Sequence, residues 1–366
     1  MSAGKVVTLA GEKEVEIVEI DELPDVGENA VLTSVKQTNV CGSEIHFWKG
    51  EFPVPNGAVL GHEAVLEVEE LGENITTDSA GQNVEEGDLI TPVYFNPCGE
   101  CAGCSNGQFY ACELVKSTGD WMQPHSIPPH FRGTFATHYY IQPDQNFYKI
   151  PENVPNHVAA SANCALSQVM FSLEKADLTR GEDLVIQGAG GLGINAIAVA
   201  KESGANVTVV EGADPRIERA KDFGADNVVD MKEFEDPGER VRRVQELTGG
   251  DGADVVLEVA GIPEAFVEGT SMVRTGGRYV EVGNISSQLT AEFSPADLTL
   301  QRTTVHAVLF YQPWYLRKSL EFLSEHAADY PYDDLLDATF PLEEAQRALE
   351  GSASQEFTRA SLIPEE

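Results

Sequence analysis

Residues 183–193 read Asp-Leu-Val-Ile-Gln-Gly-Ala-Gly-Gly-Leu-Gly, and this stretch decides the fold of the C-terminal half of the chain. The apolar run 184–187 predicts a strand, and the pattern over 194–203 predicts a helix. Between them lies the spacing G-x-G-x-x-G, whose glycines allow a tight turn, a close approach to a pyrophosphate, and close packing of helix on strand. The helix N-terminus presents free amides to the phosphates. We therefore expect a dinucleotide cofactor to bind at Gly188, Gly190, Gly191, Leu192 and Gly193; a glycine-rich turn in an unrelated α/β fold is the alternative.

A carboxylate at the end of the next predicted strand bears on the choice of cofactor. Glu211 closes the strand 207–211, where an acid can accept hydrogen bonds from the adenosine ribose. This position favours NAD over NADP. Arg216 lies nearby in the sequence and could meet a 2'-phosphate instead, and Glu211 could equally be one more surface acid.

Strands and helices alternate through this part of the chain, whereas the N-terminal part consists of short strands. Further strands are predicted at 227–230, 255–259 and 279–282, with helices at 215–223, 239–248 and 263–273, which implies crossover units and a doubly wound parallel sheet. Up to about residue 150, short strands at 15–20, 30–35, 64–71, 88–92 and 136–141 predict a mostly β unit. The tail is too short for a third domain. We expect an α/β fold with a mostly β domain over 1–160 and 306–366 and a dinucleotide-binding domain over 161–305.

The charge of the chain excludes several partners. The 366 residues include 60 Asp and Glu against 24 Lys and Arg, which gives a net charge of -36. Nucleic acids and anionic membranes repel such a surface, so neither is expected as a partner. The sequence shows neither a membrane span nor a signal peptide, and we expect a cytoplasmic protein. Because concentrated salt screens self-repulsion, the acidity also predicts a halophilic source; an ordinary acidic protein is the alternative.

Four of the six cysteines lie close together in the sequence. Cys98, Cys101, Cys104 and Cys112 follow one another among turn residues, a spacing that suits a closed tetrahedral zinc site. Such a site would stabilise a lobe and take no part in chemistry. An iron-sulfur cluster or two disulfides are the alternatives.

The other two cysteines can be combined with a histidine. Cys41, Cys164 and His62, which precedes Glu63, could form an open catalytic zinc site with two thiolates and one imidazole. Because these residues lie far apart in the sequence, spacing alone supports this weakly. A buried cysteine or a packed histidine is the common alternative.

Taken together, these motifs resemble the zinc-dependent alcohol dehydrogenases of the medium-chain dehydrogenase/reductase superfamily. The resemblance covers the whole chain and rests on residues 41–46, 61–63, 163–165 and 282–284, the four-cysteine segment and the glycine loop. It implies a GroES-like catalytic domain and a Rossmann domain. It also implies that Cys41, His62 and Cys164 bind a catalytic zinc, with Glu63 as the neighbouring acid and Ser43 and His46 as a proton relay. Gly283 and Arg359 resemble cofactor-contacting residues of the family.

The chain departs from the family pattern near these motifs. Glu44 stands where an Asp commonly orients a ligand histidine, which leaves the support of that ligand in question. Gly42 replaces a basic residue that many relatives direct toward the pyrophosphate, and Gln168 replaces a Thr near the nicotinamide. Cofactor contacts are expected to be fewer at these two positions.

The resemblance implies a small alcohol or carbonyl substrate. The pocket candidates by resemblance are Ser43, Tyr94, Phe135 and Leu309, with Trp48 and Trp121 nearby in the sequence, and most of them are aromatic or apolar. We expect one catalytic and one structural zinc, NAD as the preferred cofactor, and a homodimer or homotetramer. A polyol or sugar dehydrogenase, a zinc-free quinone or enoyl reductase, and a binding protein without catalytic activity are the alternatives.

Overall fold

The computed structural model describes residues 3–116 and 123–364, which divide into two compact units. The first unit ends at Ser167 and resumes at Gln312; the second comprises Gln168–Tyr311. Both boundaries fall a few residues later than the expected positions at 160 and 306. Among the described residues, no helix is long and apolar enough to cross a membrane.

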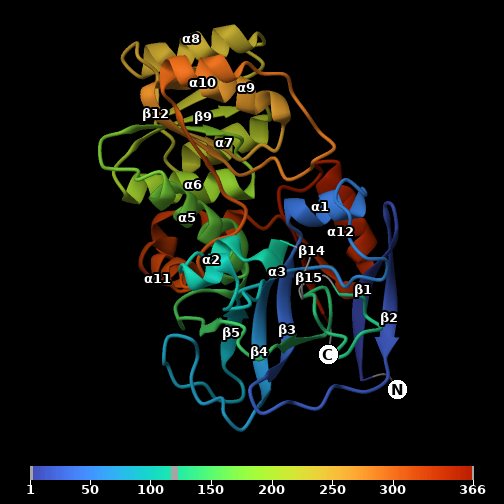
Figure 1. The fold of residues 1–366 in the computed structure, drawn as a ribbon. Helices are drawn as coiled ribbons and strands as arrows, with labels where there is room; N and C mark the ends of the chain where they lie inside the picture. Colours follow the sequence, from blue (N-terminus) through green and yellow to red (C-terminus); the bar gives the residue numbers. More distant parts are fainter. Residues whose placement is uncertain (1–2, 117–122, 365–366) are drawn as a thin grey trace. The chain divides into compact units, whose positions relative to one another are not determined.

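The first unit is built on two sheets (Figure 1). A two-stranded sheet contains β1 (Gly4–Gly11) and β2 (Glu14–Ile20), and a larger mixed sheet has the order β14-β15-β3-β4-β5-β7, with β6 also pairing with β3. The strands of the larger sheet are β3 (Val31–Asn39), β4 (Glu63–Leu71), β5 (Leu89–Pro92), β6 (His138–Ile141), β7 (Phe147–Lys149), β14 (Ala338–Pro341) and β15 (Ala360–Ile363). β1, β7 and the two C-terminal strands are absent from the sequence prediction.

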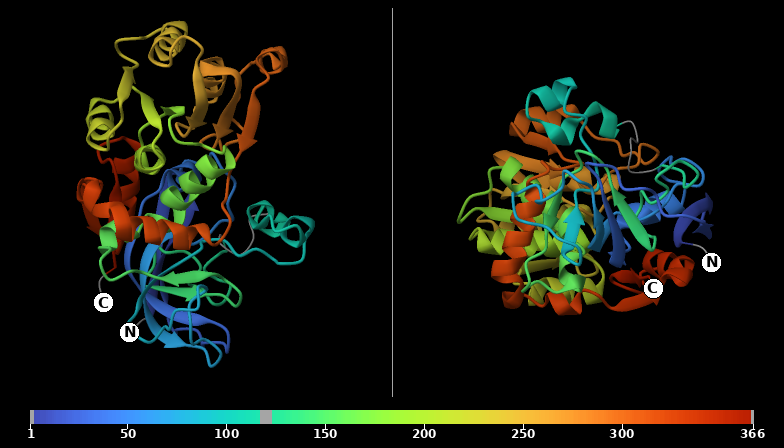
Figure 2. Two further views of the ribbon diagram at one scale, coloured as in Figure 1. Left: turned by 90° about the vertical axis from the view of Figure 1, so that its left-hand side faces the viewer. Right: turned by 90° about the horizontal axis from the view of Figure 1, so that it is seen from below.

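The C-terminal tail returns to the first unit, as the sequence predicts (Figure 2). β15 pairs antiparallel with β3 through Ser361 and Asn39, and β14 extends the sheet in parallel with β15. Apolar residues from both ends of the chain share one core, in which Val7, Trp48 and Phe135 pack with Leu349 and Leu362.

Short helices complete the first unit. They are α1 (Gly42–Trp48), α2 (Ala102–Ser105), η1 (Phe109–Ala111), α3 (Glu113–Lys116), α4 (Asn156–Ala159), the π-helix η2 (Ala162–Leu166), α11 (Tyr315–His326), η3 (Ala327–Asp329), η4 (Tyr332–Asp334), η5 (Leu342–Glu344) and α12 (Ala345–Ala353). The helix α11 packs against η2, which explains why the first unit extends to Ser167.

The second unit is a parallel sheet with the order β10-β9-β8-β11-β12-β13. Its strands are β8 (Asp183–Gln187), β9 (Asn206–Glu211), β10 (Asn227–Asp230), β11 (Ala253–Glu258), β12 (Val273–Glu281) and β13 (Thr304–Ala307). Its helices are α5 (Ser167–Lys175), α6 (Gly191–Glu202), α7 (Asp214–Asp222), α8 (Pro237–Leu247), α9 (Pro263–Met272) and α10 (Pro295–Gln301). The strand order reverses beside β8, as in a doubly wound fold.

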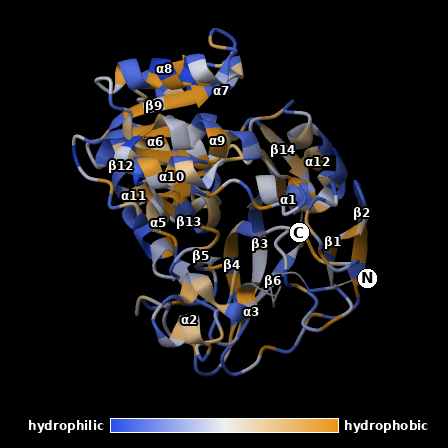
Figure 3. Cartoon of the chain, turned by 45° about the horizontal axis from the view of Figure 1, so that its top comes forward, coloured by the Kyte–Doolittle hydropathy of each residue, from blue (hydrophilic) through white to orange (hydrophobic). Residues whose placement is uncertain are grey.

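The distribution of apolar residues along the strands and helices explains the layered fold of the second unit. The central strands are hydrophobic while α7 and α8 carry charged faces (Figure 3), because a covered parallel strand is buried on both sides and a surface helix on one. The α/β fold class is thereby confirmed. One boundary differs: α6 begins at Gly191, before the predicted residue 194, because Gly190 is already its N-cap.

Candidate metal centres and cofactor site

Four residues of the first unit bring possible metal ligands together. One ligand atom from each of Cys41, His62, Glu63 and Cys164 lies within 4.8 Å of the others. The Cys41 and Cys164 sulfurs are 3.8 Å apart, and His62 Nε2 is 3.2 Å from the Cys164 sulfur. The structure therefore brings together the four side chains that the resemblance places at one metal site.

Each ligand lies where a regular element begins or is distorted. Cys41 precedes α1, His62 precedes β4, and Cys164 lies in the π-helix η2. The neighbouring Asn163 amide donates to the carbonyls of His62 (2.7 Å) and Pro92 (3.0 Å), which ties the π-helix to β4 and β5. Tertiary contacts therefore hold the three ligands together.

Glu44 provides the support for the ligand histidine that the sequence left in question. Its Oε1 lies 2.5 Å from His62 Nδ1, and its Oε2 accepts the Cys41 backbone N–H at 3.0 Å. A carboxylate on Nδ1 leaves Nε2 as the ligand nitrogen and orients the ring. Glu44 therefore contacts both the ring of His62 and the backbone of Cys41.

Protonation in the cluster follows from burial and close contact. The hydrogen bond with Cys164 lowers the pKa of Cys41 well below its usual value, and the same bond and burial raise the pKa of Cys164. Burial raises the pKa of Glu44. Burial alone would lower the pKa of His62, but Glu44 and Cys41 outweigh it and raise the pKa to about 10. A metal ion would displace the protons on the thiols and on Nε2, so metal affinity here depends on pH.

The donor set fits zinc. Two thiolates and one imidazole are the ligands of an open catalytic zinc site, which keeps a fourth position for an exchangeable group. Glu63 Oε1 is buried and has no hydrogen-bond partner within residues 3–116 and 123–364, so a further oxygen donor is available at the cluster. The residues present therefore suit the ion that the resemblance implies.

Arg359 pairs with Glu63 in the same unit. Its guanidinium bonds to Glu63 Oε2, and the two side chains are 11% and 0% exposed. The resemblance implied a cofactor contact for Arg359, and the sequence analysis did not anticipate this pair. The ion pair compensates the buried carboxylate beside the cluster.

The proposed relay residues lie on α1. Ser43 and His46 are three positions apart and therefore share one helix face. The Ser43 hydroxyl bonds to the Cys41 thiol. His46 Nδ1 lies 2.6 Å from Glu51 Oε2, a contact that the sequence analysis missed. The spacing of five residues between His46 and Glu51 across the end of the helix is the sequence feature that could have predicted this contact.

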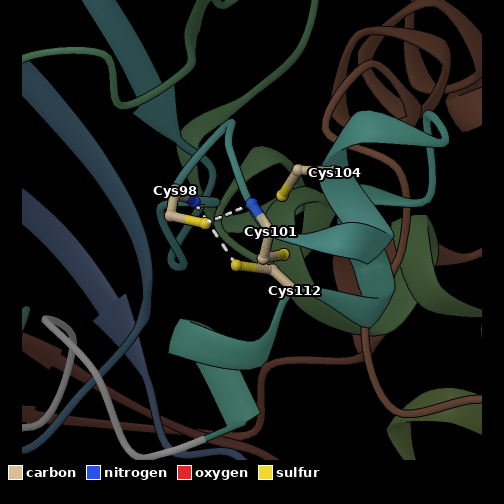
Figure 4. A group of neighbouring side chains, drawn as sticks. All are labelled: Cys98, Cys101, Cys104 and Cys112. Carbon is tan, nitrogen blue, oxygen red and sulfur yellow. Dashed lines mark hydrogen bonds between the residues drawn. The ribbon is translucent and has the colours of Figure 1, made fainter.

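The second cluster is local. Cys98, Cys101, Cys104 and Cys112 direct their sulfurs toward one another (Figure 4), and their ligand atoms also lie within 4.8 Å. The Cys98 sulfur accepts the Cys101 N–H at 3.4 Å, and the Cys112 sulfur accepts the Cys98 N–H at 3.3 Å. Backbone N–H groups lower the pKa of Cys101 to about 6, whereas burial raises that of Cys104 to about 12. Four converging sulfurs suit a closed zinc site.

The glycine loop lies at the carboxyl end of β8. Gly188 has φ +99° beside Ala260, and a Cβ at Gly193 would lie 2.0 Å from the Gly188 carbonyl oxygen, so both positions require glycine. At Gly190 a Cβ would meet nothing within 4 Å. Gly191 is exposed and Leu192 is half-buried in the first turn of α6, a 12-residue helix. Open space before a helix N-terminus at a topological switch point fits a dinucleotide pyrophosphate.

Glu211 and Arg216 lie beside this loop. Glu211 Oε2 accepts the Ala189 N–H at 2.9 Å, and Oε1 accepts the N–H groups of Gly212 and Ala213. The Arg216 Nη1 atom is 3.8 Å from Glu211 Oε2. These bonds hold the carboxylate at the end of β9, where an adenosine ribose would lie.

A second carboxylate, which the sequence analysis missed, organises the same edge of the sheet. Glu258 is 0% exposed and accepts N–H groups of Ala260, Gly261 and Gly283 at 2.6–2.9 Å. A Cβ at Gly283 would lie 2.5 Å from Gly261 N. Burial and the neighbouring Glu281 raise the pKa of Glu258 to about 8. Glu258 therefore joins the loops that follow β11 and β12.

The expected pocket residues have different environments. Tyr94 is buried against the His62 ring at a centroid distance of 4.8 Å. Phe135 is 0% exposed in the core, so its assignment to the pocket is wrong. Trp48 (6% exposed) lies in the same core, which α1 and α12 help to form. Leu309 is exposed in the second unit. Trp121 lies outside the described residues.

Comparison with known proteins agrees with this geometry. The family description "Alcohol dehydrogenase GroES-like domain" matches residues 27–152, and "Zinc-binding dehydrogenase" matches residues 191–325. The chain is 31% identical to 5-exo-hydroxycamphor dehydrogenase of Pseudomonas putida, over 91% of this chain and 92% of that protein. It is 34% identical to sorbitol dehydrogenase of Halalkalibacterium halodurans over 71% of each chain.

Structural comparison gives the same assignment. The crystal structure of an alcohol dehydrogenase from Thermotoga maritima has a TM-score of 0.91 and 29% identity over 99% of each chain. A GroES-like domain and a Rossmann-type domain with these cysteine clusters define a zinc-type dehydrogenase. The chain belongs to the zinc-dependent alcohol dehydrogenase family of the medium-chain dehydrogenase/reductase superfamily. The family implies zinc and a nicotinamide cofactor.

Proposed function

We propose that this protein is a zinc-dependent alcohol dehydrogenase that transfers a hydride between a primary or secondary alcohol and NAD. The observation that carries the proposal is the convergence of Cys41, His62 and Cys164. A zinc ion at these ligands supplies Lewis acidity toward an alcohol or carbonyl oxygen, and a nicotinamide accepts or returns the hydride. A second zinc in the four-cysteine lobe would be structural.

The protein's own groups bind, orient and move protons. Glu44 holds His62 so that its Nε2 points to the thiolates. Ser43 would take the proton of the substrate hydroxyl and release its own toward His46. Glu63 remains paired with Arg359 beside the cluster, and we propose that it approaches the metal when the fourth ligand exchanges.

We propose that the cofactor lies over the glycine loop. Gly188, Gly190, Gly191, Leu192 and Gly193 would contact the pyrophosphate, and Glu211 would bind the adenosine ribose, which favours NAD. The bonds that Glu211 accepts from Ala189 and Ala213 support this role, because they hold the acid rigid. Arg216 could contact the adenosine phosphate, and Gly283 and Arg359 could supply further contacts.

A polyol or sugar is the second candidate substrate class. The relatives include sorbitol dehydrogenase, and the L-threonine 3-dehydrogenase of Pyrococcus horikoshii is 31% identical over 82% of each chain. D-xylulose reductase A of Aspergillus oryzae is 31% identical over 71% of this chain. These names favour a hydroxyl-bearing small molecule without selecting one.

One assay tests the proposal. Absorbance of the reduced nicotinamide is followed in molar KCl with NAD or NADP and with alcohols, polyols or aldoses, before and after chelation. We expect turnover with NAD that a strong chelator abolishes and zinc restores. Chelator-resistant reduction of a quinone or enone would contradict it and support a zinc-free reductase.

The cellular setting is part of the proposal. A net charge of -36 supports a halophilic protein without nucleic-acid or membrane partners. We further propose a cytoplasmic homodimer or homotetramer, in line with the family resemblance. We expect the melting temperature to rise from dilute buffer to molar KCl, because salt screens carboxylate repulsion. An unchanged melting curve would contradict the adaptation to salt.

A further inference from the structure

Glu51 lies directly after α1 and contacts the histidine of the proposed relay. Its Oε2 is 2.6 Å from His46 Nδ1, and its backbone N–H donates to the His46 carbonyl at 2.9 Å. The side chains of His46 and Glu51 are 27% and 35% exposed, so the pair is partly open to solvent.

The chemistry of this contact determines which ring nitrogen carries hydrogen. An ionised carboxylate only accepts hydrogen bonds, so in neutral His46 the proton lies on Nδ1 and Nε2 keeps a lone pair. Without such a partner a neutral imidazole exchanges between the two tautomers. The Glu51 carboxylate therefore prepares Nε2 as the basic nitrogen.

We infer that Glu51 is a positioning residue that completes a Ser43–His46–Glu51 proton path. The inference rests on the proposed function. During alcohol oxidation the hydroxyl proton passes to Ser43, the Ser43 proton reaches His46 Nε2, and Glu51 stabilises the imidazolium through Nδ1–H. The ring then releases one proton to water, while the hydride leaves with the nicotinamide.

Other charged groups adjoin this end of α1. Lys49 ends the helix, and Glu12 from the turn between β1 and β2 lies against Gly50. Among the described residues, the hydrogen-bond partner of the His46 ring is Glu51, whose backbone N–H also bonds to the His46 carbonyl. The tautomer is thus tied to Glu51.

Two substitutions distinguish the charge of the Glu51 carboxylate from its capacity to accept a hydrogen bond. Glu51→Gln keeps an oxygen acceptor but removes the charge, and Glu51→Leu removes both. We expect kcat for alcohol oxidation to fall about 10-fold in Glu51→Gln and about 100-fold in Glu51→Leu near neutral pH, with KM and zinc content unchanged. The loss should shrink at alkaline pH, where hydroxide can accept the proton.

A matched control exists in the same unit. His157 Nε2 lies 2.6 Å from Asp333 Oδ1, the same distance as in the relay pair, with no contact to the cysteine clusters among the described residues. Asp333→Asn should leave kcat and its pH profile unchanged. Equal losses in both variants would indicate general electrostatics and overturn the inference.

A second measurement does not depend on turnover. In ¹⁵N-histidine-labelled protein, with His46 assigned by a His46→Gln spectrum, we expect the Nδ1–H tautomer in the wild type and Nε2–H in Glu51→Leu. An Nε2–H tautomer in the wild type, or full kcat in Glu51→Leu at every pH, would overturn the inference. Absence of turnover in the wild type together with the Nδ1–H tautomer would instead count against the proposed function alone.

Discussion

The two cysteine clusters differ in how the chain builds them. Cys98, Cys101, Cys104 and Cys112 come from one segment, and backbone N–H groups of that segment bond to two of their sulfurs. Cys41, His62 and Cys164 come from the starts of α1 and β4 and from the π-helix η2. The first cluster needs only local turns, whereas the second requires the folded first unit.

This difference teaches what each cluster can do. A metal held by four sulfurs would leave no position for a substrate, so a metal bound in the lobe would contribute stability and not chemistry. The long-range cluster has three strong ligands, a carboxylate nearby and charged groups that orient it. The predictions below test this division, from the largest expected effect to the smallest.

Removal of a long-range ligand should abolish catalysis and spare the fold. We expect His62→Ala to lower kcat/KM by at least about 10³-fold, because the group that polarises the substrate oxygen is lost. The melting temperature should change little, and metal analysis should show one fewer zinc per chain. Retained activity with one zinc missing would contradict the assignment of this cluster as catalytic.

Removal of a local ligand should have the opposite result. We expect Cys104→Ser to lower the free energy of unfolding by about 3 kcal/mol, since a buried metal ligand is lost. The kcat of the folded fraction should stay near the wild-type value. Denaturant unfolding measures this effect, and Ser105→Ala, a substitution at the exposed neighbouring residue, is the control. Wild-type stability and zinc content in Cys104→Ser would refute the structural role.

The buried carboxylate behind His62 should tune the catalytic metal alone. In Glu44→Gln the side chain is neutral and has one acceptor oxygen, so it cannot accept from both Cys41 N–H and His62 Nδ1–H. We therefore expect zinc affinity to fall about 10- to 100-fold. Competition with a chromophoric chelator measures this. Zinc in the four-cysteine lobe should be unaffected, and an equal loss from both sites would show that Glu44 acts through global stability.

The pair Glu258 and Glu281 extends the comparison to the second unit, which has no cysteine cluster among its described residues. The pKa of Glu258 is about 8 in the fold, above its usual value of 4.5. Between these values the folded state holds a proton that the unfolded state releases, so stability falls as pH rises from about 4.5 to about 8.

Removal of one charge should weaken this pH dependence. In Glu281→Gln the amide can donate to Glu258 and its oxygen can still accept the Asn284 N–H, so repulsion disappears. We expect a stabilisation on the order of 1 kcal/mol at pH 8 and little change near pH 5. Thermal melts at both pH values check this, and equal shifts at the two would contradict it.

Sequence patterns predicted the regular parts of the fold. Strands β8 to β10 and helices α7 to α9 lie within a few residues of the predicted ranges, because buried strands and amphipathic helices have characteristic periods. β1 was missed because most of its residues are buried without the alternation of a surface strand. β14 and β15 were missed because they are short and gain stability from pairing with β3.

The site residues also differ in how far the sequence predicted them. The glycine loop and the four-cysteine lobe could be predicted because their residues are neighbours in sequence. The set Cys41, His62 and Cys164 came from a family resemblance, since spacing alone supported it weakly. The pairs between Arg359 and Glu63 and between Glu258 and Gly283 had no local signal.

The sequence by itself determined the α/β class, the glycine turn before α6 and the cysteine lobe, because each depends on backbone conformation or spacing within one segment. Only the tertiary structure decided which distant side chains meet: Glu44 on His62, Glu51 on His46, and Arg359 on Glu63. The physical reason is that a charge removed wholly or partly from water is stabilised by a partner, and the fold of the whole unit brings that partner to it.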